Sequence, residues 1–240
     1  DGGCGQQTAA FNVNRLCGSG LQAIVSASQS IMLGDTEVAI GGGAENMSRA
    51  PYASLSTRFG ARMGDAKLVD MLLGALHDPF DNIHMGVTAE NIAAKWGISR
   101  DQQDATAVES HRRAERATKE GYFKDQIVPV MLKTRKGELA FEVDEHFRSN
   151  CQPEDMTKLK PVFLKENGTV TAGNASGLND AAAAVVLMSG QAVKAQGVRP
   201  LARLVAYAHA GVDPRFMGIG PVPATQAALK KAGLSVADLD

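Results

Sequence analysis

Asn14-Arg15-Leu16-Cys17-Gly18-Ser19-Gly20-Leu21 connects a segment with the pattern of a strand to a segment with the pattern of a long helix. Residues 8–16 alternate in character and end polar, which predicts the strand. Residues 20–33 show helical apolar periodicity and stop at Gly34, which predicts the helix. The junction therefore places Cys17 at the start of a helix.

Cys17 is the first candidate for catalysis. The positive end of a helix dipole and the unpaired N–H groups of a first helical turn both favour a thiolate. Gly18 and Gly20 let the backbone turn and leave the sulfur uncrowded. A buried structural cysteine is the common alternative for a free thiol. The flanking glycines favour a nucleophile that forms a covalent intermediate.

A short apolar segment, residues 37–42, follows the turn at Gly34-Asp35 and is predicted to be a buried strand. Strand, helix and strand form a βαβ unit, which predicts an α/β protein with a mainly parallel sheet. The run Gly41-Gly42-Gly43 lacks both the spacing and the Gly-Lys-Ser/Thr ending of phosphate-binding loops. We interpret these glycines as sites of close backbone packing.

Composition is that of an ordinary globular protein. The 240 residues are 44% hydrophobic and 21% charged, with a formal net charge of −1. This balance gives no electrostatic case for nucleic acid or for an anionic membrane. The longest uninterrupted apolar run, residues 181–188, is too short to span a bilayer. We therefore expect neither a nucleic-acid partner nor a membrane partner.

The cysteines and histidines do not suggest a metal site. The three cysteines are widely spaced with no Cys-x-x-Cys pair, so neither a disulfide framework nor zinc is expected. The chain shows no secretory signal pattern, so we expect a cytoplasmic location. It opens without Met and closes directly after a helix, so we expect an internal piece of a longer protein. Four histidines have no ligand spacing: His77, His111, His146 and His209.

The middle of the chain, from residue 47 to residue 171, changes character and resembles an insertion. It is polar and rich in turns, and a capping box at Ser99 and Gln102 marks its longest helix. Its predicted elements are helices over 66–76, 87–96 and 99–120 and a hairpin over 127–134 and 138–143. Regular α/β sequence then returns, with strands predicted over 180–188 and 201–210 and helices over 189–196 and 223–231.

Three further residues are candidates for a binding site. His84 precedes a predicted helix, where a histidine is as often a cap or surface residue as a functional one. Ser176 lies in a run of small and polar residues, 171–180, which indicates either a close ligand approach or a tight turn. Arg148 has the chemistry of a phosphate clamp, although a lone arginine is usually only solvated.

These motifs together resemble the thiolases, the acetyl-CoA C-acetyltransferase family. Within it, the chain is most similar to bacterial biosynthetic β-ketothiolases, especially those that accept acyl groups longer than acetyl. The matching segments occur in family order over nearly the whole chain: Asn14–Leu21, Gly42–Ser48, His84–Asn91, Gly168–Asp180, Gly211–Pro214 and Met217–Pro221.

The resemblance implies a five-layer αβαβα fold with an inserted loop domain, here incomplete at both ends. Two similar halves make up this fold, and the loop domain interrupts the first. The implied divisions are 1–47 for the end of the N-terminal half, 48–176 for the loop domain, 177–198 for the returning strand and helix, and 199–240 for the start of the C-terminal half.

The resemblance also implies residue roles. Cys17 matches the acylated nucleophile, and its backbone N–H matches part of an oxyanion hole. Three residues match positions that line the pantetheine and acyl site: His84, Met85 and Ser176. Three more fall where the family contacts coenzyme A: Leu76, Arg148 and Met217. Met63 falls where a residue reaches a neighbouring subunit's site, so a homodimer or homotetramer is expected.

The implied activity is Claisen condensation of two acyl-CoA molecules and the reverse thiolysis, in fatty acid or polyhydroxyalkanoate metabolism. CoA thioesters are the expected substrates, with no permanently bound cofactor and no metal. A non-catalytic, lipid-binding relative, another condensing enzyme of this fold and a hydrolase using Cys17 and His84 are the alternatives. The family's Gly-His-Pro, Cys-x-Gly-Gly and Asn-Glu-Ala-Phe motifs do not occur in these 240 residues and are expected beyond Asp240.

Overall fold

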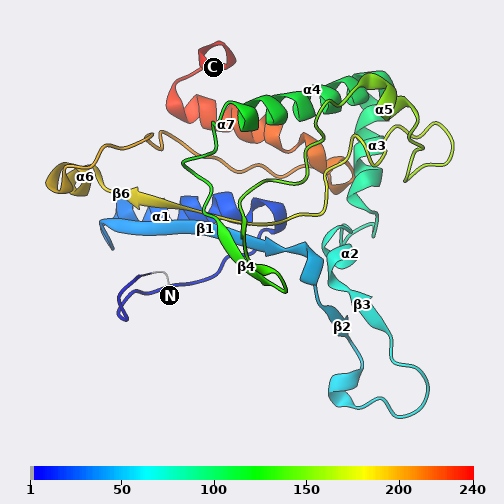
Figure 1. The fold of residues 1–240 in the computed structure, drawn as a ribbon, viewed down its shortest axis with the longest axis horizontal. Coiled ribbons are helices and arrows are strands. Elements are labelled where there is room, and N and C mark those ends of the chain that lie inside the picture. Colours follow the sequence, from blue (N-terminus) through cyan, green and yellow to red (C-terminus); the bar gives the residue numbers. More distant parts are fainter. Residues whose placement is uncertain (1–2) are drawn as a thin grey trace. The chain divides into compact units, whose positions relative to one another are not determined.

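The computed structural model describes residues 3–240 and divides the chain into two compact units. The first unit comprises Asp1–Ala75, Asn179–Gly211 and Pro221–Asp240, and the second comprises Leu76–Leu178 and Val212–Gly220. Figure 1 shows the elements of both.

The first unit is built on a helix and a two-stranded sheet. Helix α1 (Ser19–Leu33) lies along strands β1 (Val38–Asn46) and β6 (Asp180–Met188), as Figure 1 shows. The two strands are antiparallel, with Val38 opposite Met188. The expectation of a mainly parallel sheet is therefore wrong for this pair. The expected parallel partner, residues 8–16, forms no strand. Strand β6 pairs with β1 instead, and it returns after more than a hundred intervening residues, enough chain to enter in either direction.

The glycine run in β1 allows close backbone packing, which confirms the sequence interpretation. A Cβ atom on Gly41 would lie 3.0 Å from the Ile24 Cα in α1, and one on Gly43 would lie 3.5 Å from the Gly20 Cα. A Cβ atom on Gly42 would lie only 2.9 Å from the carbonyl oxygen of Ala183 in β6. The glycines thus let α1 and β6 approach β1 where side chains would hold them apart.

Replacing Gly42 with alanine is expected to lower the free energy of unfolding by about 1–3 kcal/mol, because the new methyl group meets backbone that cannot rotate away. Gly190 in helix α6 (Gly190–Gln196) is the matched control, since a Cβ atom there has no neighbour within 4 Å. We expect Gly190→Ala to be neutral or to stabilise by up to about 1 kcal/mol. Urea denaturation of both variants checks the pair, and equal stabilities would contradict the packing argument.

Two predicted strands are wrong. Residues 8–15 and 202–210 have no regular secondary structure, although both have strand-like composition. No described strand pairs with either segment, and β propensity without a ladder partner does not make a strand. The second segment instead contacts helices through Tyr207. The Gln29 side chain donates to the Tyr207 hydroxyl at 2.7 Å, and Lys231 Nζ donates to its carbonyl at 3.0 Å.

The predicted helix over 66–76 is shorter than expected. Leu68–Asp70 forms strand β3, which pairs antiparallel with β2 (Tyr52–Ser54), and only Met71–Ala75 is helical (α2). The Asp70 carboxylate accepts the N–H of Leu72 at 2.9 Å, which explains why the helix begins after Asp70. The other elements of this unit are α6 (Gly190–Gln196), α7 (Pro221–Ala232) and the 3₁₀ turns η1 (Leu16–Gly18), η2 (Met47–Arg49), η3 (Thr57–Phe59) and η5 (Val236–Asp238).

The second unit contains the helices predicted over 87–96 and 99–120 and the predicted hairpin. Helix α3 ends at Gly97, whose φ of 66° is left-handed, and α4 begins with the predicted Ser99–Gln102 capping box. Val108, Cys151 and Met156 form its buried apolar cluster. Its elements are α3 (Met85–Trp96), α4 (Arg100–Lys119), β4 (Val130–Thr134), β5 (Gly137–Phe141), α5 (Pro153–Thr157) and η4 (Pro214–Ile219).

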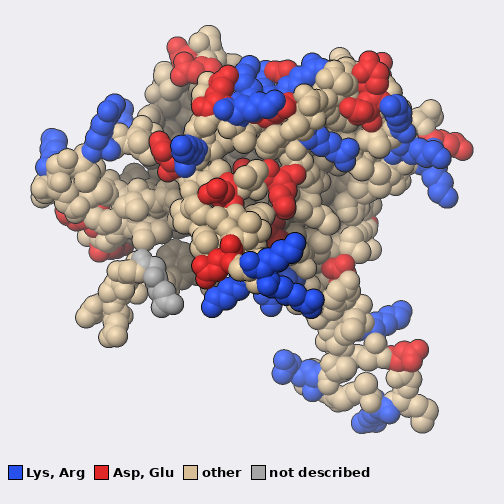
Figure 2. Space-filling model, viewed as in Figure 1, with Lys and Arg blue, Asp and Glu red and all other residues tan. Residues whose placement is uncertain are grey.

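One helical segment of the described chain, Leu16–Leu33, is long and apolar enough by length and composition to cross a bilayer, with a mean hydropathy of 1.2. This segment contains no long uninterrupted apolar run, because Ser and Gln residues lie between its apolar residues. Core helices of globular proteins pass the same test. Figure 2 shows Lys and Arg side chains interspersed with Asp and Glu on the visible face, in keeping with the balanced composition.

Candidate functional site

Cys17 is exposed in the 3₁₀ turn η1, directly before the N-cap of α1. Leu16, the preceding residue, has a φ of 49°, a left-handed conformation that costs free energy for a residue with a side chain. Local hydrogen bonds hold it. The Leu16 N–H donates to Asn14 Oδ1 at 2.9 Å, and the Ser19 hydroxyl donates to the Leu16 carbonyl at 2.7 Å. The turn therefore holds the thiol outward at the helix start.

The N-cap of α1 leaves donors available near Cys17. Gly18 has no side chain to accept a hydrogen bond from the first helical N–H groups. Such a helix start favours negative charge. The two other thiols differ. Cys4 is exposed in a loop, whereas Cys151 is buried, and burial together with the nearby Asp155 charge raises the pKa of its thiol.

His84 caps helix α3. Its Nδ1 accepts the N–H of Gly86 at 3.0 Å. This confirms the helix cap, which the sequence left open beside a functional role. Its ring stacks on Phe163 with the centroids 4.7 Å apart and meets the edge of His77 at 5.2 Å. Burial, and then the charge of His77, lower the pKa of His84 from its ordinary 6.5. His84 is therefore a neutral acceptor at neutral pH.

We expect this cap to make stability depend on pH. As the pH falls through 6.5, the unfolded state binds a proton at His84 before the folded state does, so stability decreases with acidification. His84→Asn keeps a capping oxygen and removes the titration. Urea denaturation between pH 7.5 and 5.5 should show a smaller loss for this variant than for the unmodified protein. Identical losses would mean that His84 does not couple to folding.

The structure brings Leu76, His84 and Met85 together in the second unit. The N–H of Met85 donates to the carbonyl oxygen of Leu76 at 2.8 Å, and the adjacent residues His84 and His77 form an isolated antiparallel bridge. All three side chains are half-buried. The first turn of α3 and the chain before it thus present three of the predicted site residues on one short stretch of backbone.

Ser176, Arg148 and Met217 are exposed residues of the same unit. The small residues around Ser176 have close neighbours within the protein. A Cβ atom on Gly177 would lie 2.1 Å from His146 Cε1, and one on Gly173 would lie 2.5 Å from Leu159 Cδ1. A side chain at either glycine would therefore displace the end of a neighbouring side chain, irrespective of any ligand.

Hydrogen bonds hold the backbone at Arg148 and the backbone two residues before Met217. The Arg148 N–H donates to His111 Nδ1 at 3.1 Å. Segment η4, which carries Met217, contacts α3: Asn91 Nδ2 donates to the carbonyl oxygen of Arg215 at 3.0 Å. Cys17 and Met63 belong to the first unit, where Met63 is 99% exposed in the loop between β2 and β3 (Figure 1).

Sequence reasoning missed Glu90 and Phe163. Phe163 lies over the His84 ring, and Glu90 is a carboxylate only 4% exposed that accepts four hydrogen bonds. The available signal was the position of Glu90 on the buried face of α3 with Thr88 and Ala93. Within residues 3–240, no three His, Cys, Asp or Glu side chains group as metal ligands.

Comparison with known proteins gives a consistent match. The model of the thiolase N-terminal domain matches residues 1–191, and that of the C-terminal domain matches residues 198–240. The chain is 69% identical over its full 240 residues to the beta-ketothiolase BktB of Cupriavidus necator, covering 61% of that protein. It is 51% identical to an acetyl-CoA acetyltransferase of Paracoccus denitrificans over 239 residues, 99% of this chain and 61% of that protein.

Solved structures agree. Human mitochondrial 3-ketoacyl-CoA thiolase superposes with a TM-score of 0.94 at 49% identity, over 99% of this chain and 60% of that one. The same enzyme in complex with CoA gives a TM-score of 0.93 at 48% identity, over 99% of this chain and 59% of that one. The chain thus spans about three fifths of the length of these relatives. It belongs to the thiolase family and has the α/β fold of thiolases.

Proposed function

We propose that the protein containing this chain is an acetyl-CoA C-acyltransferase. It condenses acetyl-CoA with a second acyl-CoA to give a 3-ketoacyl-CoA and CoA, and it catalyses the reverse thiolysis. The observation that carries this proposal is the 69% identity over the whole chain to a beta-ketothiolase, with Cys17 exposed at the start of α1. The CoA complex of a similar thiolase supports CoA thioesters as substrates.

In the proposed mechanism, the Cys17 thiolate attacks the carbonyl carbon of an acyl-CoA and CoA leaves as thiolate, which gives an acyl-enzyme. A bound acetyl-CoA then loses an α-proton to a base, and its carbanion attacks the acyl carbon and displaces Cys17. A covalent nucleophile divides one difficult step into two easier ones. The backbone N–H of Cys17 contributes to the oxyanion hole that carries the developing charge.

The roles of the other residues follow from the same proposal. His84, Met85 and Ser176 line the pantetheine and acyl part of the site, and Leu76, Arg148 and Met217 contact coenzyme A. The half-buried positions of His84 and Met85 at the start of α3 support their assignment to the pantetheine and acyl part of the site. No permanently bound cofactor or metal takes part.

The assembly is also a proposal. Met63, 99% exposed on the loop between β2 and β3, reaches the site of a neighbouring subunit in a homodimer or homotetramer. Residues 48–176 form the loop domain inserted between parts of the N-terminal half. The protein acts in the cytoplasm, without a nucleic-acid or membrane partner.

An assay of the full-length protein tests the function. Purified protein is incubated with CoA and either acetoacetyl-CoA or 3-ketovaleryl-CoA, and loss of the 3-ketoacyl absorbance is followed while products are identified. We expect two acyl-CoA products from each substrate. Release of free acid would indicate a hydrolase, and binding of substrate without turnover would indicate a non-catalytic relative.

A further inference from the structure

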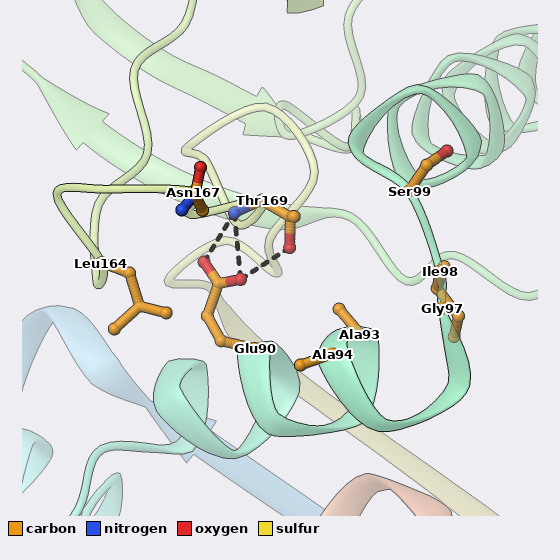
Figure 3. A pocket seen from close by; sticks show the side chains of 9 residues that line it. All are labelled: Glu90, Ala93, Ala94, Gly97, Ile98, Ser99, Leu164, Asn167 and Thr169. Carbon is orange, nitrogen blue, oxygen red and sulfur yellow. Dashed lines mark hydrogen bonds between the residues drawn. The ribbon is translucent and has the colours of Figure 1, made fainter.

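Glu90 is a buried carboxylate to which the site described above assigns no role. It lies in the second turn of α3, with 4% of its surface exposed. Oε1 accepts the N–H groups of Thr169 at 2.9 Å and Val170 at 2.8 Å, and Oε2 accepts the Thr169 hydroxyl at 2.6 Å. Figure 3 shows the carboxylate directed at Thr169. These donors satisfy the buried charge, so Glu90 binds the protein's own backbone.

The contacts of Glu90 join two segments that carry predicted site residues. Helix α3 begins with Met85 next to its cap His84, five residues before Glu90. Thr169 lies in the same loop as Ser176, the segment between α5 and β6. The Glu90 carboxylate therefore fixes the position of this loop relative to helix α3.

A second buried carboxylate holds the far end of the same loop. Asn174 Nδ2 donates to Asp104 Oδ1 at 2.9 Å, and Arg100 pairs with the other oxygen of Asp104 at 2.7 Å. The N–H of Thr171, a fully buried residue, donates to Asn174 Oδ1 at 2.8 Å. The loop from Thr169 to Asn174 is thus held by hydrogen bonds that it donates to Glu90 in α3 and to Asp104 in α4.

Packing alone does not hold the loop on the side of Glu90. A hollow of about 230 Å³ lies there, bordered by the small side chains of Ala93 and Ala94 on α3 and by Thr169 on the loop (Figure 3). Because no large side chain fills this space, the loop has room to shift when its hydrogen bonds to Glu90 are lost. The Glu90 carboxylate therefore restrains the loop at this point through its bonds to Thr169 and Val170. Two other hydrogen bonds of 3.0 Å act beside it, from Asn174 Nδ2 to the Thr169 carbonyl oxygen and from the Val162 N–H to the Val170 carbonyl oxygen.

We propose that Glu90 is a positioning residue, which acts through Thr169 and Val170 to set where Ser176 lies relative to the start of α3. The proposal rests on the proposed function, since its consequence is the placement of the acyl-pantetheine part of a CoA thioester. Glu90 itself does not touch the substrate. Replacing it misplaces the binding surface while the Cys17 turn, in the other unit, is left unchanged.

The test compares Glu90→Gln with Glu109→Gln in the full-length protein. A glutamine keeps one oxygen for the N–H groups that Oε1 accepts, but it places an NH₂ donor where Oε2 accepts the N–H and hydroxyl of Thr169. Glu109 is the matched control, because its side chain is 52% exposed and forms its ion pair with Arg113 of the same helix, α4. We expect Glu90→Gln to raise KM for acetoacetyl-CoA about tenfold or more, since misplacement of about 1 Å costs up to roughly 100-fold.

Two further readouts separate positioning from general damage. Iodoacetamide should label Cys17 at the same rate in Glu90→Gln as in the unmodified protein, while amide exchange of residues 169–175 should become faster. Thr169→Val, which removes only one hydroxyl bond, should raise KM by a smaller factor, and Thr169→Ser should restore it. This milder pair decides the question where Glu90→Gln fails to fold.

Unchanged KM in folded Glu90→Gln or in Thr169→Val would overturn the proposal. Parallel loss of kcat and of Cys17 labelling would also overturn it, because it would indicate a general structural role. An inactive unmodified protein would refute the proposed function instead. In that case amide exchange of residues 169–175 still decides whether Glu90 restrains the loop. Unaltered exchange in Glu90→Gln would refute that restraint.

Discussion

Cys17→Ala in the full-length protein is expected to lower thiolysis of acetoacetyl-CoA by about 10³-fold or more, because removing the nucleophile of a catalytic unit typically costs several orders of magnitude. Cys17→Ser should fall nearly as far, since a serine hydroxyl is much less acidic and a weaker nucleophile than a cysteine thiol. The exposed thiol at the start of α1 is the structural reason for this expectation.

Cys4→Ala and Cys151→Ala are the matched controls. Cys4 is exposed but lies in a loop, and Cys151 is buried with a raised pKa of its thiol. Both variants should retain activity, with some loss of stability for Cys151→Ala because it leaves a small cavity. Brief iodoacetamide treatment with peptide mapping should label Cys17 first. Equal labelling of Cys151, or full activity of Cys17→Ala, would refute the assignment.

Elements with local signals were predicted well from the sequence. Helices α1 and α3 end at Gly34 and Gly97, both left-handed, and α4 begins with the predicted capping box at Ser99. These signals act over one helical turn, so a single sequence contains them. The Cys17 turn was located for the same reason, because its glycines and the following helix are adjacent in the chain.

Features that depend on distant partners were predicted poorly. Residues 8–15 and 202–210 have strand composition but no pairing strand among the described residues. The antiparallel direction of β6 depends on how the chain returns after the second unit. Glu90 was missed because its donors lie about eighty residues further along the chain. Hydrogen bonds of this kind leave no periodic trace in a single sequence.

The 240 residues expressed alone are expected to have no thiolase turnover. They contain Cys17, but they lack the Gly-His-Pro, Cys-x-Gly-Gly and Asn-Glu-Ala-Phe motifs on which the family's chemistry depends. The resemblance to thiolases implies that an activating histidine and a second, acid/base cysteine belong to these motifs. Losses of groups that work together do not simply add. We expect a rate at least about 10³-fold below that of the full-length protein.

Cys17 in this shortened chain should still react slowly with an acyl-CoA, because its turn and the N-cap of α1 are local features. Fragment and full-length protein are compared with acetoacetyl-CoA and CoA, following both turnover and the mass of the Cys17 peptide. Circular dichroism should first establish that the fragment is helical, so that inactivity is not merely unfolding. Turnover within tenfold of the full-length rate would mean that His84 or another residue of this chain supplies the base. His84 would then act as an acid/base group, in addition to lining the pantetheine and acyl part of the site.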